Sequence, residues 1–360
     1  MPLNHYVTLG RSGLRVSPFC LGTMTFGQEW SIGVGADESA RVLDAYLERG
    51  GNFVDTANIY NKGHSEKILG DHLSANGKRG RVVLATKFCG GMDTTDPNSG
   101  GAGRKAIMAA CEQSLRRLKT DYIDLYWMHF LDAHTPIDET MRTLDMLVTQ
   151  GKVRYLGFSD VPAWKVVQAQ YEAIFRSWTP LAALQIEYSL LERSVEADLI
   201  PMAREMGLGV TPWSPLKYGI LSGKYTRDTR PKDGRGASEW VTRHLTDHAF
   251  RVIETLHETA KEQGCTPAQA ALAWLSRRPG VTSTIIGAKT LTQLEENLKG
   301  LEVTLSPASI ARLDEVTKPT LPFPHDFLQM IPTVIHGGQT INSVCAPPWG
   351  NAPKGDNDRH

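Results

Sequence analysis

The sequence lacks a surplus of charge, a long apolar run and any pairing pattern among its cysteines. Lysine plus arginine and aspartate plus glutamate each number 39, so no net field attracts nucleic acid or an anionic membrane. No apolar stretch approaches the roughly 18 residues of a membrane span, and residues 1–10 lack the apolar core of a secretory signal. The five cysteines are scattered and form no C-x-x-C pair: Cys20, Cys89, Cys111, Cys265 and Cys345. These absences predict a cytoplasmic protein with reduced thiols and without a disulfide framework or a metal site.

The sequence does contain an alternation of short β-like runs with helix-length amphipathic segments. Eight strands are expected, at Phe19–Gly22, Asn52–Asp55, Val82–Lys87, Ile123–His129, Tyr155–Ser159, Ala183–Glu187, Gly209–Thr211 and Ser283–Ile286. Helices are expected between them, among others at Asp37–Arg49, Ser65–Leu73, Lys105–Leu118, Ile137–Gln150 and Glu196–Glu205. Such an alternation is typical of a parallel sheet covered by helices.

Closure of this sheet into a (β/α)8 TIM barrel is favoured, because eight strands enclose an interior that side chains can fill. The alternative is an open, doubly wound sheet, in which a dinucleotide needs a Gly-rich turn directly after the first strand. The first strand ends in Leu21-Gly22-Thr23-Met24, which is no such turn. A looser match, Gly101-Ala102-Gly103, follows a polar loop and is interpreted as a loop that leads into a helix.

Several segments lie outside the alternation. Residues 7–18 are expected to form an N-terminal β-hairpin around a Gly-Arg-Ser-Gly turn. Long loops, at residues 90–103 and 213–240, are expected at the C-terminal face of the barrel, where loops carry function. A single barrel domain is expected at residues 1–318, followed by an irregular, proline-rich tail at 319–360 whose last ten or so residues are disordered.

Four polar residues fall where the chemistry of such a barrel is usually found. Asp55, Lys87 and His129 end three consecutive strands, and Tyr60 follows five residues after Asp55. The C-terminal rim of the barrel would bring the four groups round one pocket. A tyrosine can donate a proton to a carbonyl oxygen, and a lysine ammonium beside it favours the tyrosinate and lowers its pKa from about 10. The set therefore predicts acid–base chemistry at a carbonyl or alcohol oxygen.

Simpler interpretations exist for the same residues. A buried Asp55–Lys87 pair can tie two strands together without any catalytic part. His129 and His134 do not predict a metal site, because a five-residue separation across a strand end and a loop is not a typical spacing of metal ligands. No third ligand is evident either.

The sequence also resembles a known family. The segment Gly51-Asn52-Phe53-Val54-Asp55-Thr56-Ala57-Asn58-Ile59-Tyr60, followed by Ser65-Glu66 and Gly70, is similar to the aldo-keto reductase signature. Further motifs follow in that family's order: Thr86-Lys87, Trp127-Met128-His129, Gly157-Phe158-Ser159, Gln185-Ile186-Glu187-Tyr188-Ser189, Trp213-Ser214-Pro215-Leu216, Gly219–Tyr225 and Ile286-Gly287-Ala288. The resemblance spans residues 5–318 and is greatest to the bacterial and fungal branch that includes aryl-alcohol dehydrogenases and potassium-channel β-subunits.

The resemblance implies an oxidoreductase that transfers a hydride between NADP(H) and a small aldehyde, ketone or alcohol. It implies Tyr60 as the general acid/base, with Lys87, Asp55 and His129 completing a catalytic tetrad. Substrate contacts are expected from Tyr60, His129 and the loop residue Trp30. Cofactor contacts are expected from Thr23, Ser159, Asp160, Gln185, Trp213, Ser214, Leu216, Gly219, Ser222, Lys224, Gly287, Ala288, Lys289, Gln293, Glu296 and Asn297.

Two positions depart from the family's pattern. Asp160 stands where many members have Asn, and its acid either weakens the contact to the nicotinamide carboxamide or caps the next helix through Pro162. Near the eighth strand, Lys289 is present, but Gln293 stands where many NADP-specific members have Arg. A lysine can still meet a 2′-phosphate as a point charge, so NADP is favoured, with NAD as the alternative.

Two other functions remain open at this stage. One is a nucleotide-binding, redox-sensing regulatory subunit similar to the channel β-subunits, which turnover would distinguish from an enzyme. The other is a barrel isomerase or aldolase with a Schiff base on Lys87, which predicts borohydride trapping. The sequence names neither the substrate nor the oligomeric state.

Overall fold

The computed structural model describes residues 2–231, 236, 238–353, 355 and 358. The chain divides into two compact units, Met1–Thr317 and Lys318–His360, which are described separately. In the part of the chain that is described, no helix is long and apolar enough to cross a membrane.

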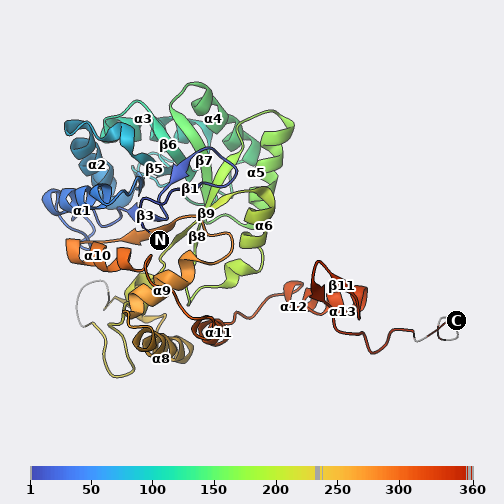
Figure 1. Ribbon diagram of the computed structural model, residues 1–360. Coiled ribbons are helices and arrows are strands. Elements are labelled where there is room, and N and C mark those ends of the chain that lie inside the picture. Colours follow the sequence, from blue (N-terminus) through green and yellow to red (C-terminus); the bar gives the residue numbers. More distant parts are fainter. Residues whose placement is uncertain (1, 232–235, 237, 354, 356–357, 359–360) are drawn as a thin grey trace. The chain divides into compact units, whose positions relative to one another are not determined.

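The first unit is built on eight parallel strands: β3 (Phe19–Gly22), β4 (Phe53–Asp55), β5 (Val83–Phe88), β6 (Ile123–Met128), β7 (Val153–Ser159), β8 (Leu181–Glu187), β9 (Gly209–Trp213) and β10 (Thr284–Gly287). Their order in the sheet is β10-β3-β4-β5-β6-β7-β8-β9. A parallel bridge between Val210 and Val281 and a 2.8 Å hydrogen bond from Thr282 N to Val210 O join the two ends. The ring seen in Figure 1 confirms the (β/α)8 barrel, and the doubly wound alternative is wrong.

Helices surround the ring, because each carries one apolar face that packs on the strands. The longer ones are α1 (Ala36–Glu48), α2 (His64–Ala75), α3 (Arg104–Leu118), α4 (Ile137–Thr149), α5 (Ala163–Phe175), α6 (Leu199–Met206), α8 (Asp247–Glu262), α9 (Pro267–Ser276), α10 (Leu291–Lys299) and α11 (Pro307–Val316). The start of α9 shows how the sequence fixes such a boundary. Thr266 and Gln269 form a capping box around Pro267 in the first turn.

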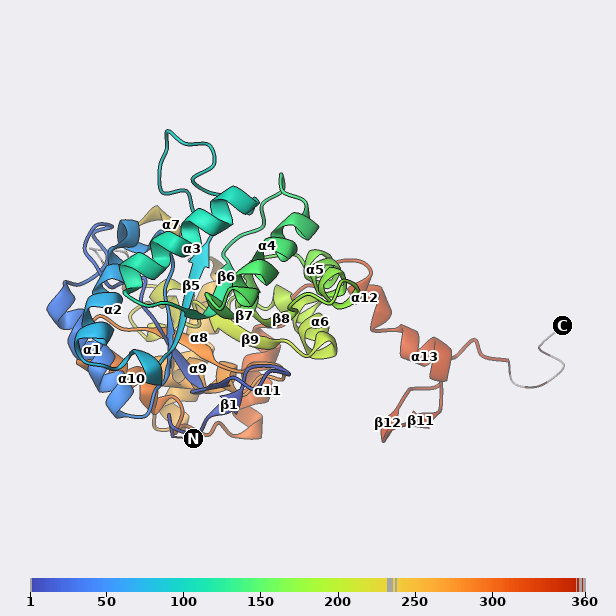
Figure 2. The ribbon, with the colours of Figure 1, turned by 90° about the horizontal axis from the view of Figure 1, so that it is seen from above.

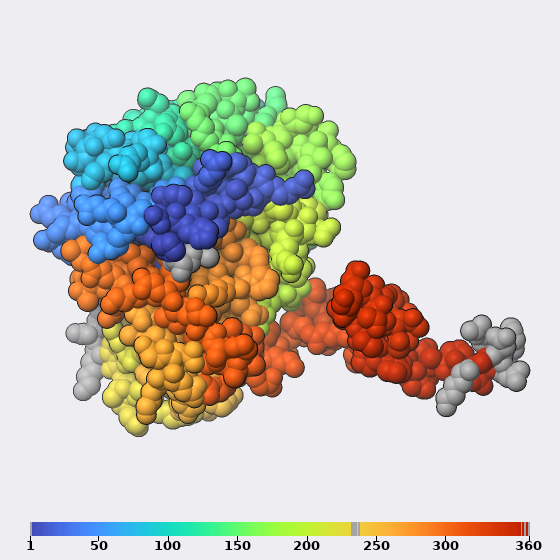
Figure 3. All heavy atoms as spheres, in the orientation of Figure 1, coloured from blue at the N-terminus to red at the C-terminus, as the bar shows by residue number. Residues whose placement is uncertain are grey.

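The N-terminal hairpin closes one end of the barrel interior. Strands β1 (Val7–Thr8) and β2 (Arg15–Val16) pair antiparallel, as predicted. Leu9 and Val16 are fully buried in one cluster with interior residues of the barrel such as Phe53. Figure 3 shows this segment in dark blue across one face of the first unit.

Long loops leave the opposite, C-terminal ends of the strands. The loop between β5 and α3 extends well beyond its strand in Figure 2. Its Gly-rich stretch, Gly101 to Gly103, leads directly into α3, of which Gly103 is the N-cap. A 2.9 Å hydrogen bond from Ala102 N to Asp132 fixes this stretch. The loop after β9 contains η4 (Lys217–Ser222) and α7 (Glu239–Thr242). Residues 232–235 and 237 of this predicted long loop lie outside the described residues.

The second unit is less irregular than expected. It contains α12 (His325–Leu328), α13 (Ile331–His336) and a two-stranded hairpin of β11 (Thr340–Ile341) and β12 (Val344–Cys345). The expectation of disorder at the very end concerns a segment of which residues 354, 356–357 and 359–360 lie outside the described part.

The Trp127 side chain is tightly packed in the barrel interior. This ring is fully buried, and it occupies the space beside Gly157, where a Cβ atom would lie 2.3 Å from Trp127 Cζ3. Interiors at crystal-like density cannot absorb such an overlap without moving backbone or side chains. Gly157 is therefore required by its neighbour on β6.

We expect Gly157→Ala to lower the free energy of unfolding by about 1–3 kcal/mol through overpacking. The measurement is urea denaturation followed by far-UV circular dichroism. Gly80→Ala is the matched control, because nothing lies within 4 Å of a Cβ at that position. A loss no larger than the control's would show that the interior can relax around the added methyl group.

Candidate active site

The centre of the C-terminal rim is a lysine ammonium whose three protons all have acceptors. Lys87 is fully buried on β5 and forms an ion pair with Asp55 Oδ1. Its Nζ also donates to the Thr56 carbonyl oxygen at 2.8 Å and to the Tyr60 hydroxyl oxygen at 3.2 Å. An ammonium has three donors and no acceptor, so this environment satisfies it completely.

The sheet register brings these groups together. Asp55 ends β4 and lies beside Ala85 of β5, two residues before Lys87. Tyr60 opens the short η1 helix (Tyr60–Gly63), in which Asn61 and Lys62 have φ of 46° and 56°. Asn tolerates this left-handed conformation. The turn folds the Tyr60 side chain back over Lys87, whose Nζ lies 4.8 Å from the phenol ring centroid.

Asn61 is a residue that sequence reasoning missed. Its fully buried amide donates to the carbonyl oxygens of Met24 and Phe26 at 2.9 and 3.1 Å and accepts from Trp30 N at 3.1 Å. It thus fixes the loop after β3 against the Tyr60 turn. The only signal in the sequence was an Asn next to the tyrosine, which by itself does not name its partners.

Ser65 begins the predicted helix but does not cap α2. The N-cap of α2 is Gly63, without a side-chain hydrogen bond. The Ser65 hydroxyl lies 3.0 Å from Thr23 Oγ1 and 2.8 Å from Thr56 Oγ1. The three hydroxyls join the ends of β3 and β4 to α2 and hold the Thr56 peptide against Lys87.

Aromatic rings wall the space above Tyr60. The His129 ring, directly after β6, meets the Tyr60 ring edge-on at 5.7 Å, and Trp30 meets it from another side at 6.1 Å. Phe130, which sequence reasoning missed, stacks on His129 at 4.0 Å. The structure thus places the three predicted substrate contacts, Trp30, Tyr60 and His129, in one aromatic wall.

Burial controls the protonation states here. Desolvation, reinforced by the Lys87 charge, lowers the pKa of His129 to about 2, so the imidazole is neutral. Desolvation raises the pKa of Tyr60 above its usual value, although Lys87 opposes the rise. Lys87 therefore acts on the phenol in the predicted direction, but burial outweighs it and the pKa of Tyr60 is raised. Burial also opposes the charge on Lys87, but Asp55 and Tyr60 outweigh it and raise the pKa of the ammonium.

A second group of predicted residues lies along the neighbouring strand ends. Ser159 ends β7, pairs in register with Gln185 of β8, and has a buried hydroxyl without a hydrogen-bond partner among the described residues. Gln185 Nε2 donates to Asp55 Oδ2 at 3.1 Å, which ties this group to the lysine pair. Trp213 ends β9, and its indole Nε1 donates to Asp160 Oδ1 at 3.0 Å. Asp160 therefore holds Trp213 and does not cap α5, whose N-cap Pro162 has no side-chain hydrogen bond.

The remaining predicted cofactor residues occupy two loops and a buried strand end. After β9, Ser214 and Gly219 both have positive φ, and Ser214 Oγ accepts from Tyr218 N at 3.0 Å. Leu216, Ser222 and Lys224 belong to the same loop. Thr23 is buried and donates to Asp55 O at 3.0 Å.

The other loop follows β10. Asn297 donates to Gly287 O at 3.1 Å, and Gln293 accepts from Lys289 N at 2.9 Å. The Ala288 side chain is buried in the core, so only its backbone faces the loop, while Glu296 is exposed on α10.

The fold and this rim define a class of protein, a (β/α)8 barrel with a buried lysine–carboxylate pair beneath a tyrosine. The model of the Aldo/keto reductase family matches residues 18–318 of the chain. The protein belongs to that family of oxidoreductases.

Relatives of known sequence agree with this assignment. An uncharacterised oxidoreductase of Bacillus subtilis is 39% identical over 86% of this chain and 95% of its own length. A putative aryl-alcohol dehydrogenase of Saccharomyces cerevisiae is 33% identical over 93% of this chain and 92% of its own length. A probable voltage-gated potassium channel subunit beta of Arabidopsis thaliana is 35% identical over 88% of this chain and 98% of its own length.

The depressed pKa of His129 has a consequence for stability. Its folded pKa of about 2 lies below the unfolded value of about 6.5, so only the unfolded chain takes up this proton as the pH falls below 6.5. We expect this single group to lower the free energy of unfolding by about 2 kcal/mol between pH 7.5 and 5. Urea denaturation at both pH values measures the loss.

His129→Gln should remove that share of the pH dependence, whereas the exposed His5→Gln should keep the wild-type slope. Identical slopes for wild type and His129→Gln would mean that the folded protein protonates His129 readily.

Proposed function

We propose that the protein reduces aldehydes and ketones, or oxidises the corresponding alcohols, with NADP as cofactor and Tyr60 as the general acid/base. A bound nicotinamide supplies the hydride at carbon or accepts it. The chain's own residues then provide the proton at oxygen, the orientation of the substrate and the exclusion of water.

The observation that carries this proposal is the contact between Lys87 and Tyr60. The Lys87 ammonium lies 3.2 Å from the hydroxyl oxygen of Tyr60. A phenol that gives up its proton to a substrate oxygen becomes an anion, and the adjacent cation stabilises that anion. Asp55 and the Thr56 carbonyl keep the ammonium charged and in place. In the direction of oxidation, Tyr60 takes the proton from the alcohol.

His129 is assigned to substrate positioning. It is neutral, since desolvation lowers its pKa to about 2, and its buried Nδ1 has no hydrogen-bond partner among the described residues. A neutral imidazole can donate one hydrogen bond to a carbonyl oxygen without competing for the proton that Tyr60 transfers.

The residues along β7, β8 and β9 fit a nicotinamide cofactor. The Ser159 hydroxyl is buried and lies close enough to the Asp160 carboxyl group to lower its pKa, so a carboxamide would take up a hydroxyl that now faces Asp160. Gln185 Nε2 donates to Asp55, and the side-chain carbonyl oxygen of Gln185 can accept a hydrogen bond from the amide of the cofactor. Trp213 offers a ring whose orientation Asp160 fixes. Ser214 and the loop to Lys224 are assigned to the pyrophosphate, and residues 287–297 to the adenosine end.

The aromatic wall supports aryl aldehydes and aryl alcohols as substrates. Trp30, Tyr60, His129 and Phe130 present ring faces and edges on one side of the site. Planar aromatic molecules pack favourably against such rings, and a relative from yeast carries the name of an aryl-alcohol dehydrogenase. A regulatory role like that of a channel subunit is the second candidate, and the resemblance to such a subunit favours it. A cytoplasmic location accompanies either proposal.

Tyr60→Phe should reduce turnover by about 10²- to 10⁴-fold, because the variant lacks only the proton donor. Cofactor binding should stay within a few-fold. Turnover is followed by absorbance of the reduced nicotinamide with aryl aldehydes, and binding by quenching of tryptophan fluorescence. Tyr171→Phe, on the exposed face of α5, is the control for loss of a phenol. Turnover near that of the wild type would remove Tyr60 from the mechanism, and no turnover by the wild type would favour the regulatory role.

Lys289→Ala should weaken NADPH binding by about ten- to a hundredfold, since a charge-assisted contact to phosphate contributes about 1.5–3 kcal/mol. NADH binding should hardly change, because NADH has no 2′-phosphate. Lys289 lies in the loop before α10, and the exposed Lys299→Ala, at the C-terminal end of that helix, is the control that removes an equal charge. Equal losses for both cofactors would identify Lys289 as a structural residue and favour NAD.

A further inference from the structure

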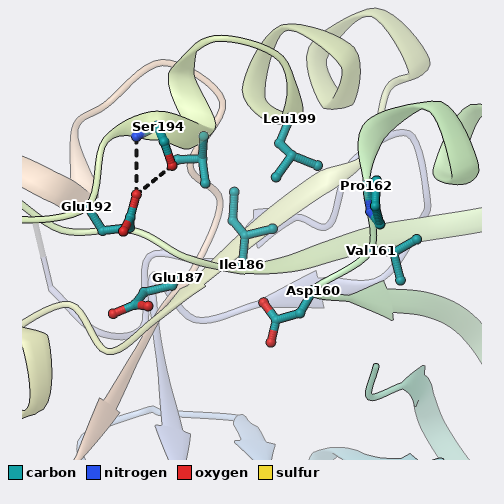
Figure 4. A pocket seen from close by; sticks show the side chains of 9 residues that line it. Asp160, Val161, Pro162, Ile186, Glu187, Glu192, Ser194 and Leu199 are labelled. Atoms are coloured by element: carbon teal, nitrogen blue, oxygen red, sulfur yellow. Dashed lines mark hydrogen bonds between the residues drawn. The ribbon is translucent and has the colours of Figure 1, made fainter. Parts of the chain in front are cut away.

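Asp160 places a carboxylate at the rim position where the proposed nicotinamide ring would lie. It directly follows Ser159, has φ of 51°, and donates its own backbone N–H to Gln185 O at 3.1 Å. Its side chain accepts from the indole of Trp213 at 3.0 Å. The carboxylate thus lies between two residues assigned to the carboxamide and the ring. Figure 4 shows that it points away from Pro162 and Leu199, the side of α5 and α6.

This carboxylate has no ion-pair partner among the described residues, although charged groups face it from two strands and neutral groups from a third strand and a turn. Lys87 of β5 is paired with Asp55, and Glu187 of β8 is paired with Lys217 at 2.8 Å. Tyr60 faces it from η1 and Trp213 from β9 as neutral groups. Lys217 also pairs with Glu192 at 3.6 Å, so each neighbouring lysine already has a carboxylate partner and Asp160 is left without one. The Asp160 residue is exposed to solvent, so a ligand on the rim can reach it, while the surrounding protein still desolvates its carboxyl group in part.

We propose that Asp160 makes the nicotinamide site discriminate between the two redox forms of the cofactor, in favour of the oxidised form. The oxidised ring carries a positive charge and the reduced ring carries none, so a carboxylate beside it stabilises only the former. The inference rests on the proposed function, which places a nicotinamide at Ser159, Gln185 and Trp213. It assigns to Asp160 a role beyond holding Trp213. Because the bound oxidised form is stabilised, bound NADPH becomes a stronger hydride donor, and the equilibrium between the bound forms shifts towards carbonyl reduction.

The preference should depend on pH, with a sign that follows from the protonation of Asp160. Desolvation raises the pKa of this carboxyl group to about 6. The charge of Glu187 adds to the rise, whereas the Trp213 hydrogen bond, the Lys87 charge and the Ser159 hydroxyl oppose it. Above pH 6 the group is charged and favours the oxidised form. Below pH 6 it is neutral and the preference fades. By linkage, binding of the oxidised form near pH 6 releases protons from Asp160.

The experiment compares dissociation constants of NADP⁺ and NADPH, measured by quenching of tryptophan fluorescence between pH 5.5 and 8. In Asp160→Asn, the amide oxygen can still accept from Trp213 and Asn tolerates positive φ. At pH 8 this variant should bind NADP⁺ about tenfold more weakly than wild type, because it lacks one charge–charge attraction near the surface. Its dissociation constant for NADPH should stay within twofold of the wild-type value. At pH 5.5, where about three quarters of the free protein carries a neutral Asp160, the difference in NADP⁺ binding should shrink to about threefold. The 2′-phosphate titrates equally in both cofactors, so it cancels from their ratio.

Glu187→Gln is the matched control, because it removes another carboxylate from the same rim. It should keep the pH dependence, with a midpoint moved to lower pH, since Glu187 raises the pKa of Asp160. Equal weakening of NADP⁺ and NADPH in Asp160→Asn, or a ratio that does not vary with pH in wild type, would overturn the proposal and leave Asp160 as support for Trp213. Failure of wild type to bind either form would overturn the proposed function itself.

Discussion

The structure of the site depends on one constraint, the burial of a lysine ammonium that no water reaches. A buried cation is tolerated only when it is paired and its hydrogen-bonding capacity is filled. Lys87 meets this condition with three acceptors: the Asp55 carboxylate at the end of β4, the carbonyl oxygen of Thr56 and the hydroxyl oxygen of Tyr60. Each of these acceptors is itself held. Ser65 fixes the Thr56 segment, Gln185 shares Asp55, and Asn61 shapes the turn that carries Tyr60.

The same constraint connects the two halves of the rim. Asp55 uses one oxygen for Lys87 and the other for Gln185, so the proposed acid–base group and the residues proposed to hold the nicotinamide share one carboxylate. Gln185 consequently presents its amide in a single orientation. The two proposed parts of the site are thus held in fixed positions by the barrel rim, and such preorganisation is what positioning and electrostatic stabilisation require.

Much of the fold and the central residues of the site could be predicted from the sequence, because both depend on local pattern. Parallel strands that are buried on both faces appear as short apolar runs, and a polar residue at the end of such a run stands out. Asp55, Lys87 and His129 were visible in this way. Asn61, Ser65 and Phe130 were not, since an amide, a hydroxyl and a ring in a loop acquire meaning only from partners that are distant in the sequence.

The sequence by itself determined the order of strands and helices, their number and hence the barrel, because hydrophobic period and turn chemistry act over a few residues. Tertiary structure alone decided protonation and orientation. Whether Tyr60 has a lowered or a raised pKa depends on how much protein covers it as well as on Lys87. Whether Asp160 caps a helix or holds Trp213 depends on where β9 ends relative to β7. Desolvation and hydrogen-bond geometry are properties of assembled surfaces, and they come into being only when strands far apart in the chain close into one ring.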